Sequence, residues 1–451
     1  MAACRKEDAF TGDASARLTF STDTIMFDTV FSQVAPIRPL SITKQFWVIN
    51  PNAKGVKTNI RIAGNQFGIF KLNIDGLPAN AVFQKEIRGN DSIAIFVQVY
   101  LDAVGSNTPF IVTDQLLFET NGNQQDVDLV AYAQDAIYLS NEVVNCNSGN
   151  LHWTADKPYV IYDSILVPSG CVLTIDAGTK IHSHNASTVL VAGTIIVNGT
   201  ADKNVVFESD RLDGDYRDRP GQWGGIHLLA SSTNNVINHA VIKNSLIGIR
   251  VDSLSTNQNP KLLLRNSKIQ NVLVHGLLAL NADITAINNV ITNCGSFTFF
   301  GRFGGRYNLY FNTFANYGFT FNRQNQHFLL DNGPIKNESG QIVSVNPLTV
   351  IMLNNIVYGS RDEEILISND PTGGTASYTL QNNLLRTEIL SLGVNGNILN
   401  KDPLFSNAAQ YEMQLKNESP AKASGVVVTT ITTDITNRSR SATAPTIGAY
   451  E

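Results

Sequence analysis

A five-residue pattern recurs six times between Ala240 and Thr387. In each copy the first residue is Asn or small, the third is apolar, and the fifth is Asn, Gly or Thr. Side chains two residues apart lie on one face of a β-strand, so each copy predicts a short strand with these three residues on the same side. The copies begin at Ala240, Ser267, Asn289, Asn312, Asn355 and Asn383.

The spacing of the copies predicts how these strands are arranged. They start 27, 22, 23, 43 and 28 residues apart, and periods of roughly 20–50 residues are typical of stacked architectures. In such a stack each buried Asn is satisfied by neighbouring backbone and by the Asn amide of the next copy. The pattern therefore predicts a parallel β-helix. The longest interval contains either an additional rung or an insertion.

The N-terminal region has a different organisation. Between residues 16 and 137, several short runs alternate apolar and polar residues, as in Thr58–Ile62 and Ile93–Val99, and clusters of Asn, Gly and Pro separate them. Short alternating strands at this spacing predict a β-sandwich. We expect a tether at 1–15, the sandwich at 16–137, a joint at 138–157 and the β-helix at 158–451.

Two groups of segments resemble known modules. Asp91-Ser-Ile93, Asp114-Gln-Leu-Leu-Phe118 and Val130-Ala-Tyr132 resemble bacterial immunoglobulin-like modules of the ASPM/SPD-2/Hydin kind. Val167–Thr179 and Val189–Thr200, with glycine at their corners, resemble the first rungs of right-handed parallel β-helix proteins. The resemblance implies an all-β chain, in which an Ig-like β-sandwich precedes a right-handed single-stranded parallel β-helix.

The C-terminal segments resemble the closing segment of bacterial surface β-helix proteins, and we expect them to cap the stack. They include Asp402–Phe405, Ser419–Ala421 and Ile447–Glu451. Ala423-Ser-Gly425 stands where that segment usually has Asp-Ala-Gly. As a whole, the chain resembles a family of bacterial surface lipoproteins with an Ig-like domain and a pectate-lyase-like β-helix. That family has no established activity, so the resemblance implies no catalytic residues.

The charge and hydropathy patterns limit the expected partners. The net charge is −5, charged residues make up 16% of the chain, and no basic block is present. Nucleic acid is therefore not an expected partner. The sequence contains no apolar run of the ~18 residues that a membrane-spanning helix needs, so we expect membrane contact through a lipid alone.

The start of the sequence predicts a lipid anchor. Ala2-Ala3-Cys4 resembles the end of a bacterial lipoprotein signal, and Lys6-Glu7-Asp8 resembles a signal for export to the outer leaflet of the outer membrane. We expect the thiol of Cys4 to carry a lipid, and the protein to be held at the outer membrane facing the cell exterior.

The other three cysteines lie in the predicted joint and β-helix. We expect a Cys146–Cys171 disulfide, which an exported protein can keep, although two buried thiols are the alternative. Cys294 is then a lone buried thiol. No CxxC pair occurs, so a zinc or redox site of that type is not expected.

Candidate chemical groups are few. Residues 210–219 hold four Asp and three Arg; Asp213 and Asp215 have spacing suited to Ca²⁺, but a salt-bridged surface loop is the favoured interpretation. His182 and His184 share a strand face without an evident third metal ligand. The acidic residues 362–364 are expected to face solvent. We expect no catalytic residue, no metal and no cofactor.

An aromatic segment supplies the candidate binding surface. Residues 297–328 contain 12 of the 38 aromatic residues. Aromatic faces beside Arg suit sugar stacking or a protein hot spot; packing in the core is the alternative. Gly301–Arg306 is expected to be a protruding loop, and residues 331–346 an extruded hairpin or loop beside it. The predicted surface comprises Phe300, Arg302, Phe303, Arg306 and Tyr307.

These observations favour a non-catalytic surface protein. It would serve as a scaffold or accessory subunit of an outer-membrane protein complex, or as a surface binding protein. The alternatives are a carbohydrate-active lyase or hydrolase, which the fold alone supports, and an adhesin that binds surface glycans.

Overall fold

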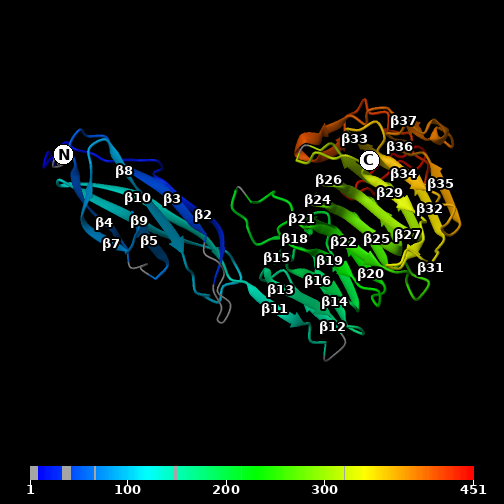
Figure 1. The fold of residues 1–451 in the computed structure, drawn as a ribbon, viewed down its shortest axis with the longest axis horizontal. Coiled ribbons are helices and arrows are strands. Elements are labelled where there is room, and N and C mark those ends of the chain that lie inside the picture. The colour runs from blue at the N-terminus through cyan, green and yellow to red at the C-terminus, as the bar shows by residue number, and fades with distance from the viewer. Residues whose placement is uncertain (1–8, 33–41, 65–67, 147–149, 215, 319) are drawn as a thin grey trace. The chain divides into compact units, whose positions relative to one another are not determined.

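The computed structural model describes residues 9–32, 42–64, 68–146, 150–214, 216–318 and 320–451. The chain forms two compact units, residues 1–136 and 137–451. In the described residues, regular secondary structure is β-strand apart from two short 3₁₀ turns at Leu390–Leu392 and Ala408–Gln410 (Figure 1). The predicted all-β fold class is confirmed.

The N-terminal unit is a β-sandwich of two five-stranded sheets. One sheet has the order β1-β3-β8-β5-β6 and the other β2-β10-β9-β4-β7. Alternating burial along β3 and β10 places one side of each sheet in a shared core that includes Phe27, Phe46, Phe70 and Phe118. The strands are Thr19–Phe20 (β1), Thr24–Phe31 (β2), Thr43–Asn50 (β3), Val56–Ile62 (β4), Phe70–Ile74 (β5), Leu77–Pro78 (β6), Ala81–Ile87 (β7), Asp91–Val99 (β8), Phe110–Thr120 (β9) and Asn123–Gln134 (β10).

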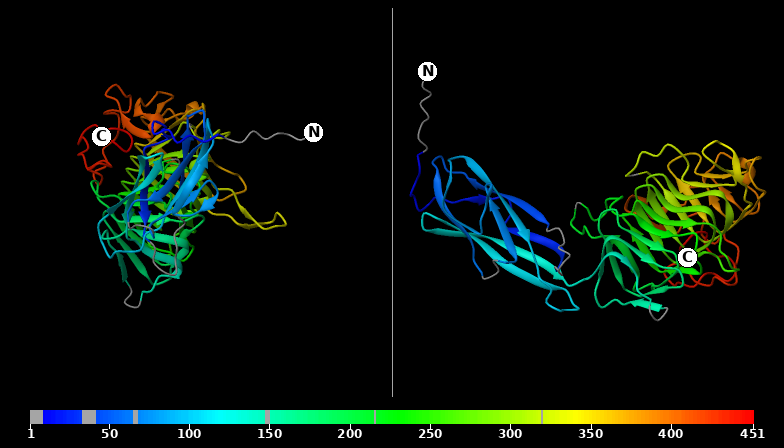
Figure 2. Two further views of the ribbon diagram at one scale, coloured as in Figure 1. Left: turned by 90° about the vertical axis from the view of Figure 1, so that its left-hand side faces the viewer. Right: turned by 60° about the horizontal axis from the view of Figure 1, so that its bottom comes forward.

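The C-terminal unit is a right-handed parallel β-helix. Its strands pair in parallel with the strands one rung away, so the rungs stack (Figures 1 and 2). The strands form three faces that the chain visits in turn. Face A contains Thr188–Val191 (β16), Gly225–Leu228 (β19), Ile247–Asp252 (β22), Phe328–Asp331 (β29) and Ile365–Ser368 (β34), together with the first parts of His275–Ile287 (β25) and Phe297–Tyr310 (β27).

Face B follows face A in each rung. It contains Asn150–Trp153 (β12), Val172–Asp176 (β14), Thr194–Asn198 (β17), Asn235–Asn238 (β20), Leu262–Arg265 (β23), Leu348–Leu353 (β32) and Ala376–Gln381 (β35), and the second parts of β25 and β27. The strands β25 and β27 therefore each bend through two faces.

Face C completes the rung and carries the repeated pattern. It contains Lys180–Ser183 (β15), Val205–Ser209 (β18), Ala240–Lys243 (β21), Lys268–Val272 (β24), Val290–Cys294 (β26), Thr313–Asn316 (β28), Ile356–Gly359 (β33), Leu384–Leu385 (β36) and Ile398–Leu399 (β37). Ile137–Val143 (β11) and Tyr159–Val167 (β13) lie at the start of the stack.

The stack starts before residue 158. The segment 138–157, where the sequence suggests a joint, contains most of β11 and all of β12, and both pair in parallel with later strands. The reason is visible in the side chains: Trp153 is buried and stacks on Tyr159 with ring centroids 4.5 Å apart, so this segment already contributes to the lumen core.

Asn side chains form a hydrogen-bonded ladder along the start of face C. The side-chain amide of each Asn donates to the Oδ1 of the Asn one rung further on, and that oxygen also accepts the backbone N–H of the donating Asn. The Nδ2–Oδ1 distances are 2.9 Å for Asn289–Asn312, 2.9 Å for Asn312–Asn355, 3.1 Å for Asn355–Asn383 and 3.0 Å for Asn383–Asn397. The ladder satisfies amides that are buried beside an aliphatic lumen.

The C-terminal segment, residues 402–451, covers the outer side of face C. The prediction that it caps the end of the stack is therefore wrong. The Asn residues just before the ladder have left-handed backbone conformations, with φ of 57° at Asn288 and 60° at Asn354, and their side chains bond to the segment. Asn288 donates to the carbonyl of Thr433, Asn354 to that of Val426, and Asn382 to that of Ser424. The rungs of Asn288, Asn354 and Asn382 each supply such an anchor, so the segment runs along the stack.

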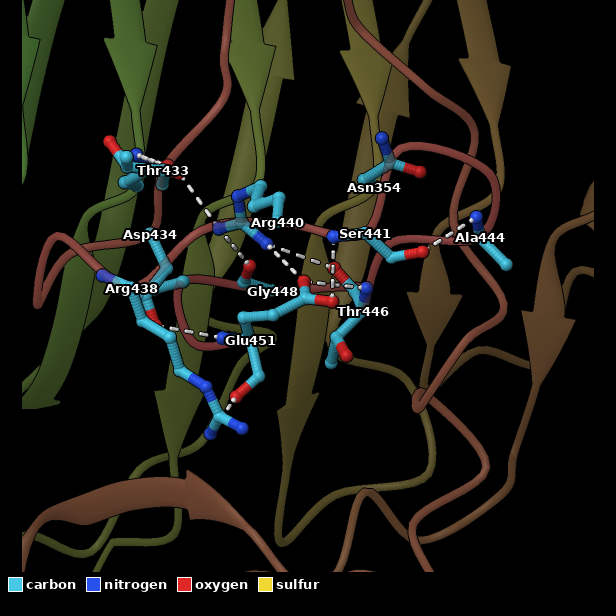
Figure 3. A network of polar contacts seen from close by, with 12 residues as sticks. Asn354, Thr433, Asp434, Arg438, Arg440, Ser441, Ala444, Thr446, Gly448 and Glu451 are labelled. Atoms are coloured by element: carbon cyan, nitrogen blue, oxygen red, sulfur yellow. Dashed lines mark hydrogen bonds and ion pairs between the residues drawn. The ribbon is translucent and has the colours of Figure 1, made fainter.

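Arg440 fixes this segment to the β-helix (Figure 3). Its guanidinium lies 3.9 Å from the ring centroid of Phe311, which replaces Asn in the left-handed column. It also donates to Asn288 Oδ1 at 2.8 Å and contacts Glu451 at 3.4 Å. Burial lowers the pKa of Arg440 to about 10 despite the opposing charge of Glu451.

Candidate functional site

The outer side of face A brings a row of side chains into register. Leu190, His227, Arg250, Leu278, Phe300 and Leu329 are paired from rung to rung. Their neighbours Leu277 and Phe299 belong to the lumen core, and alternation along a strand therefore turns the row outward. We call this row the face A row.

The first part of the row contains an ion-paired cluster. His227 Nε2 lies 2.7 Å from Asp252 Oδ2, and the Arg250 Nε donates to Asp252 Oδ1 at 2.9 Å. Burial acts to raise the pKa of Asp252, but the hydrogen bonds from His227 and Arg250 outweigh it and hold this pKa below its usual value. Asp252 is therefore an ionised anchor that orients the two basic side chains.

A recess of about 280 Å³ opens beside this cluster. His227, Arg250, Leu246 and Thr188 line it together with backbone of the Gly221–Ile226 segment. Glycine is required here because Gly225 has a φ of 111° and a Cβ at this position would overlap the carbonyl oxygen of Ile247. The missing side chains leave room for a small ligand group.

Aromatic rings surround Phe300 in the second part of the row. Phe300 stacks on Phe297 with ring centroids 4.4 Å apart, and His275 lies 4.8 Å from Phe300. Burial lowers the pKa of His275 to about 4, so this imidazole is neutral at pH 7. The Arg302 guanidinium lies over Phe300 and Phe303, at 5.4 and 5.2 Å from their centroids.

The structure corrects two features of the predicted surface. Gly301–Arg306 is not a protruding loop but the middle of β27, where Phe303 with a φ of 66° makes the bend between faces A and B. Tyr307 points into the lumen and is 1% exposed, because it pairs with Ile284 and Val350 in the face B register. Phe300, Arg302 and Phe303 remain partly exposed, and Arg306 is exposed.

The two arginines of that surface are ion-paired. Arg302 pairs with Asp331, and the Arg306 Nη2 lies 2.7 Å from Asp283 Oδ2. Asp331 Oδ1 also accepts the backbone N–H of Phe303 at 3.3 Å. These pairs form because acids that are scattered in the sequence lie on adjacent rungs.

Six of the eleven described aromatic residues of the segment are buried. Phe299, Phe311, Phe314 and Phe328 are at most 1% exposed, and Phe314 and Phe328 make an edge contact with centroids 5.0 Å apart. The alternative that these residues pack the interior therefore holds for them. Phe300 is the member of the segment that lies in the face A row.

The Asp- and Arg-rich loop is salt-bridged where the structure describes it. Arg211 pairs with Asp213 at 3.1 Å and lies 3.6 Å from the centroid of Tyr216. Asp215 lies outside the described residues. Among the residues that are described, no group of three or more His, Cys, Asp or Glu is placed to hold a metal ion.

His182 and His184 lie on face C beside acidic residues. His184 Nδ1 lies 2.7 Å from Asp210 Oδ2, and His182 Nδ1 lies 3.6 Å from Glu208. The hydrogen bond with Asp210 raises the pKa of His184, whereas burial lowers the pKa of His182. His184 thus joins the Asp-rich loop to the stack.

The acidic residues 362–364 do not all face solvent. Glu364 is fully buried, and Arg323 donates to both of its oxygens at 2.7 and 2.9 Å. A Cβ at Gly359 would overlap the Glu364 carboxylate. The fifth position of the repeat is therefore Gly on this rung, because the ion pair occupies the space that Asn fills elsewhere.

A predicted disulfide near the start of the stack is confirmed. Cys146 and Cys171 form a disulfide with a Cα–Cα distance of 5.8 Å. Cys294 is a free buried thiol, and burial raises its pKa to about 12. Cys4 lies outside the described residues. In the part of the chain that is described, no helix is long and apolar enough to cross a membrane.

Sequence reasoning did not identify His227, Arg250, Asp252 or His275 as members of one surface. The signal was present as polar residues at alternate positions of short strands, in Gly225-Ile-His-Leu228 and Ile249-Arg-Val-Asp252. These polar residues can be recognised as neighbours only when the alignment of successive rungs is known. Face A lacks the Asn pattern that indicates this alignment on face C.

Comparison with known proteins gives a similarity to one family and distant structural likenesses. No curated protein matches the chain. Among solved structures, a family 123 glycoside hydrolase from Clostridium perfringens has a TM-score of 0.19 at 6% identity, covering 26% of this chain and 25% of that one. The Vibrio cholerae VesB protease has a TM-score of 0.16 at 17% identity, covering 26% of this chain and 31% of that one.

The catalytic domain of a GH87 α-1,3-glucanase, solved with nigerose, aligns over 76% of this chain and 82% of its own, with a TM-score of 0.20 and 11% identity. The chain spans only about a quarter to a third of the first two proteins. Residues 145–284 match the model of the pectate-lyase-like β-helix domain family, so the first half of the stack is similar to that family.

Proposed function

We propose that this chain is a surface glycan-binding protein, and that a polysaccharide lies along the face A row without being cleaved. The observation that carries the proposal is the register of this row, which runs from the recess at His227 and Arg250, past the buried Leu278, to the partly exposed ring of Phe300. Ligand sites combine apolar, aromatic surface with a few fixed polar groups.

The spacing of the stack suits a linear repeating ligand. Neighbouring parallel strands lie about 4.8 Å apart, so the partly exposed side chains of the row, such as His227, Arg250 and Phe300, recur at multiples of this interval. Arg250 and His227 supply hydrogen bonds to hydroxyl groups, and the apolar face of Phe300 suits the C–H face of a sugar ring.

The carboxylates of this surface support binding rather than hydrolysis. Glycoside hydrolases use two carboxyl groups, of which one must be protonated to act as the acid. Asp252 is held ionised by His227 and Arg250, and Asp331 is paired with Arg302. Asp252 is therefore not suited to donate a proton to a glycosidic oxygen.

A panel of soluble neutral and acidic polysaccharides tests the proposal, with the chain as it stands. Affinity electrophoresis measures retardation, and assays for reducing ends and for unsaturated products measure cleavage. We expect retardation by at least one polysaccharide with no new product. The appearance of products would favour a carbohydrate-active enzyme, and a lack of retardation by every polysaccharide would contradict glycan binding.

A second candidate is a scaffold or accessory subunit of an outer-membrane protein complex. It is favoured by the exposed apolar hairpin at residues 332–347. Both candidates place the protein at the outer membrane with a lipid on Cys4, facing the exterior. Protease treatment of intact cells tests this location, since a protein that survives until lysis does not face the exterior.

A further inference from the structure

A hairpin projects from the stack between faces A and B. Residues 332–347 leave the rung after β29 and return at β32, and within them Ile335–Lys336 (β30) pairs with Ile342–Ser344 (β31) in antiparallel fashion. Figure 2 (left) shows it as the yellow element that extends away from the stack. It accounts for part of the long interval between repeat copies, which is an insertion in one rung.

The base of the hairpin is fixed. Asn332 is fully buried; its amide donates to the Asp370 carbonyl at 3.2 Å, and its Oδ1 accepts the Asp370 N–H at 2.6 Å. Gly373 and Gly374 pass so close that a Cβ on either would overlap the backbone of Asn332 or Asn346. A protrusion that is ordered in advance loses little conformational entropy when it binds.

The far strand of the hairpin is apolar and exposed. Ile342, Val343 and Val345 are 51%, 59% and 50% exposed. The charged residues of the hairpin are Lys336 and Glu338, and none occurs from residue 340 to 347. Exposed edge strands usually carry charges that prevent pairing with another chain, and this one lacks them.

The strand β31 has one unused edge. In the described part of the chain it pairs only with β30. The register shifts by one residue at Val343, and such a bulge sets two residues against one, in keeping with the exposure of both Ile342 and Val343. Main-chain pairing with a further strand would satisfy the free edge and bury these β-branched side chains.

We infer that β31 pairs with β31 of a second copy of this chain, so that two hairpins form one four-stranded antiparallel sheet. The choice of a second copy rests on self-complementarity. Antiparallel pairing about a two-fold axis sets the neutral segment 340–347 against itself, with no like charges opposite each other. An isologous contact of this kind closes as a dimer.

The small size of the contact predicts a weak dimer. Two short hairpins bury less than the ~1,200 Å² of a standard interface, and we expect dissociation in the micromolar range. Analytical ultracentrifugation of the whole chain over a wide concentration range tests this. Each of V343K and I342K should weaken the dimer at least about tenfold with an unchanged melting temperature, because both side chains are exposed.

V394K is the matched control, since Val394 is 57% exposed elsewhere in the unit, and its dissociation constant should equal that of the wild type. A wild-type chain that remains monomeric at about 300 μM overturns the inference. A dimer that both lysine variants leave unchanged overturns it as well, and a dimer that V394K disrupts equally shows that a different surface is used. These results are independent of glycan binding by the face A row.

Discussion

Asn312 and Asn355 are separated by 43 residues in the chain, yet their side chains are direct neighbours: Asn312 Nδ2 donates to Asn355 Oδ1 at 2.9 Å. The same oxygen accepts the backbone N–H of Asn312 at 2.9 Å. The ladder therefore keeps its register across the rung that carries the hairpin, and the insertion leaves the stack unbroken.

Replacing Asn312 with Leu should destabilise the β-helix. Asn289 would lose the acceptor for its backbone N–H and its amide, and Asn355 would lose a donor, at a cost of about 1–3 kcal/mol for each buried group left without a partner. Thr349→Leu changes an exposed residue of β32 and is the control. Equal melting temperatures for the two variants would show that the ladder does not stabilise the stack.

Replacing Arg440 with Met should release the C-terminal segment from face C. Glu451 would then keep a largely buried carboxylate without its cation, and Asn288 and Phe311 would lose the contacts described above. Removing one partner of a buried ion pair costs about 3–5 kcal/mol. Limited proteolysis should cut the segment faster in R440M than in R438M, in which an exposed arginine is replaced; equal rates would contradict the anchoring role.

The β-helix should lose stability in mild acid. Burial lowers the pKa values of His275 and His327 to about 4 from 6.5. The pKa values of these histidines are lower in the folded protein than in the unfolded chain. Their contribution to the free energy of unfolding is therefore fully present above pH 6.5 and is lost as the pH falls toward 4. H275F keeps a ring beside Phe300 and removes one titrating group, so its melting temperature should fall less steeply over this range. A fall as steep as in the wild type would exclude His275 as a source.

The sequence predicts the fold well where one chemical pattern repeats in one register. Asn and aliphatic residues at fixed positions of face C predict the stack and the ladder. The same pattern gives no information on face A, whose outward residues differ from rung to rung, so His227, Arg250 and Phe300 become neighbours only in the structure. Tyr307 and Glu364 are misjudged for a related reason, since local composition does not show which rung lies above or below.

The course of the C-terminal segment along face C also could not be predicted from the sequence. Its resemblance to a closing segment predicts a cap, but anchoring depends on left-handed Asn residues on several rungs, which no local pattern in the segment reveals. The hairpin at 332–347 is predictable because its charges, glycines and spacing are local features.

The central claim is that the face A row binds a glycan through the ring of Phe300, and calorimetric titration of Phe300→Ala tests it most directly. Tyr378→Ala is the control, because Tyr378 is an aromatic residue 51% exposed on face B. With a polysaccharide that retards the wild type, F300A should bind about tenfold more weakly, a loss of about 1.4 kcal/mol, while Y378A binds like the wild type and all three melt alike. Equal affinities of F300A and the wild type would contradict the assignment of this face.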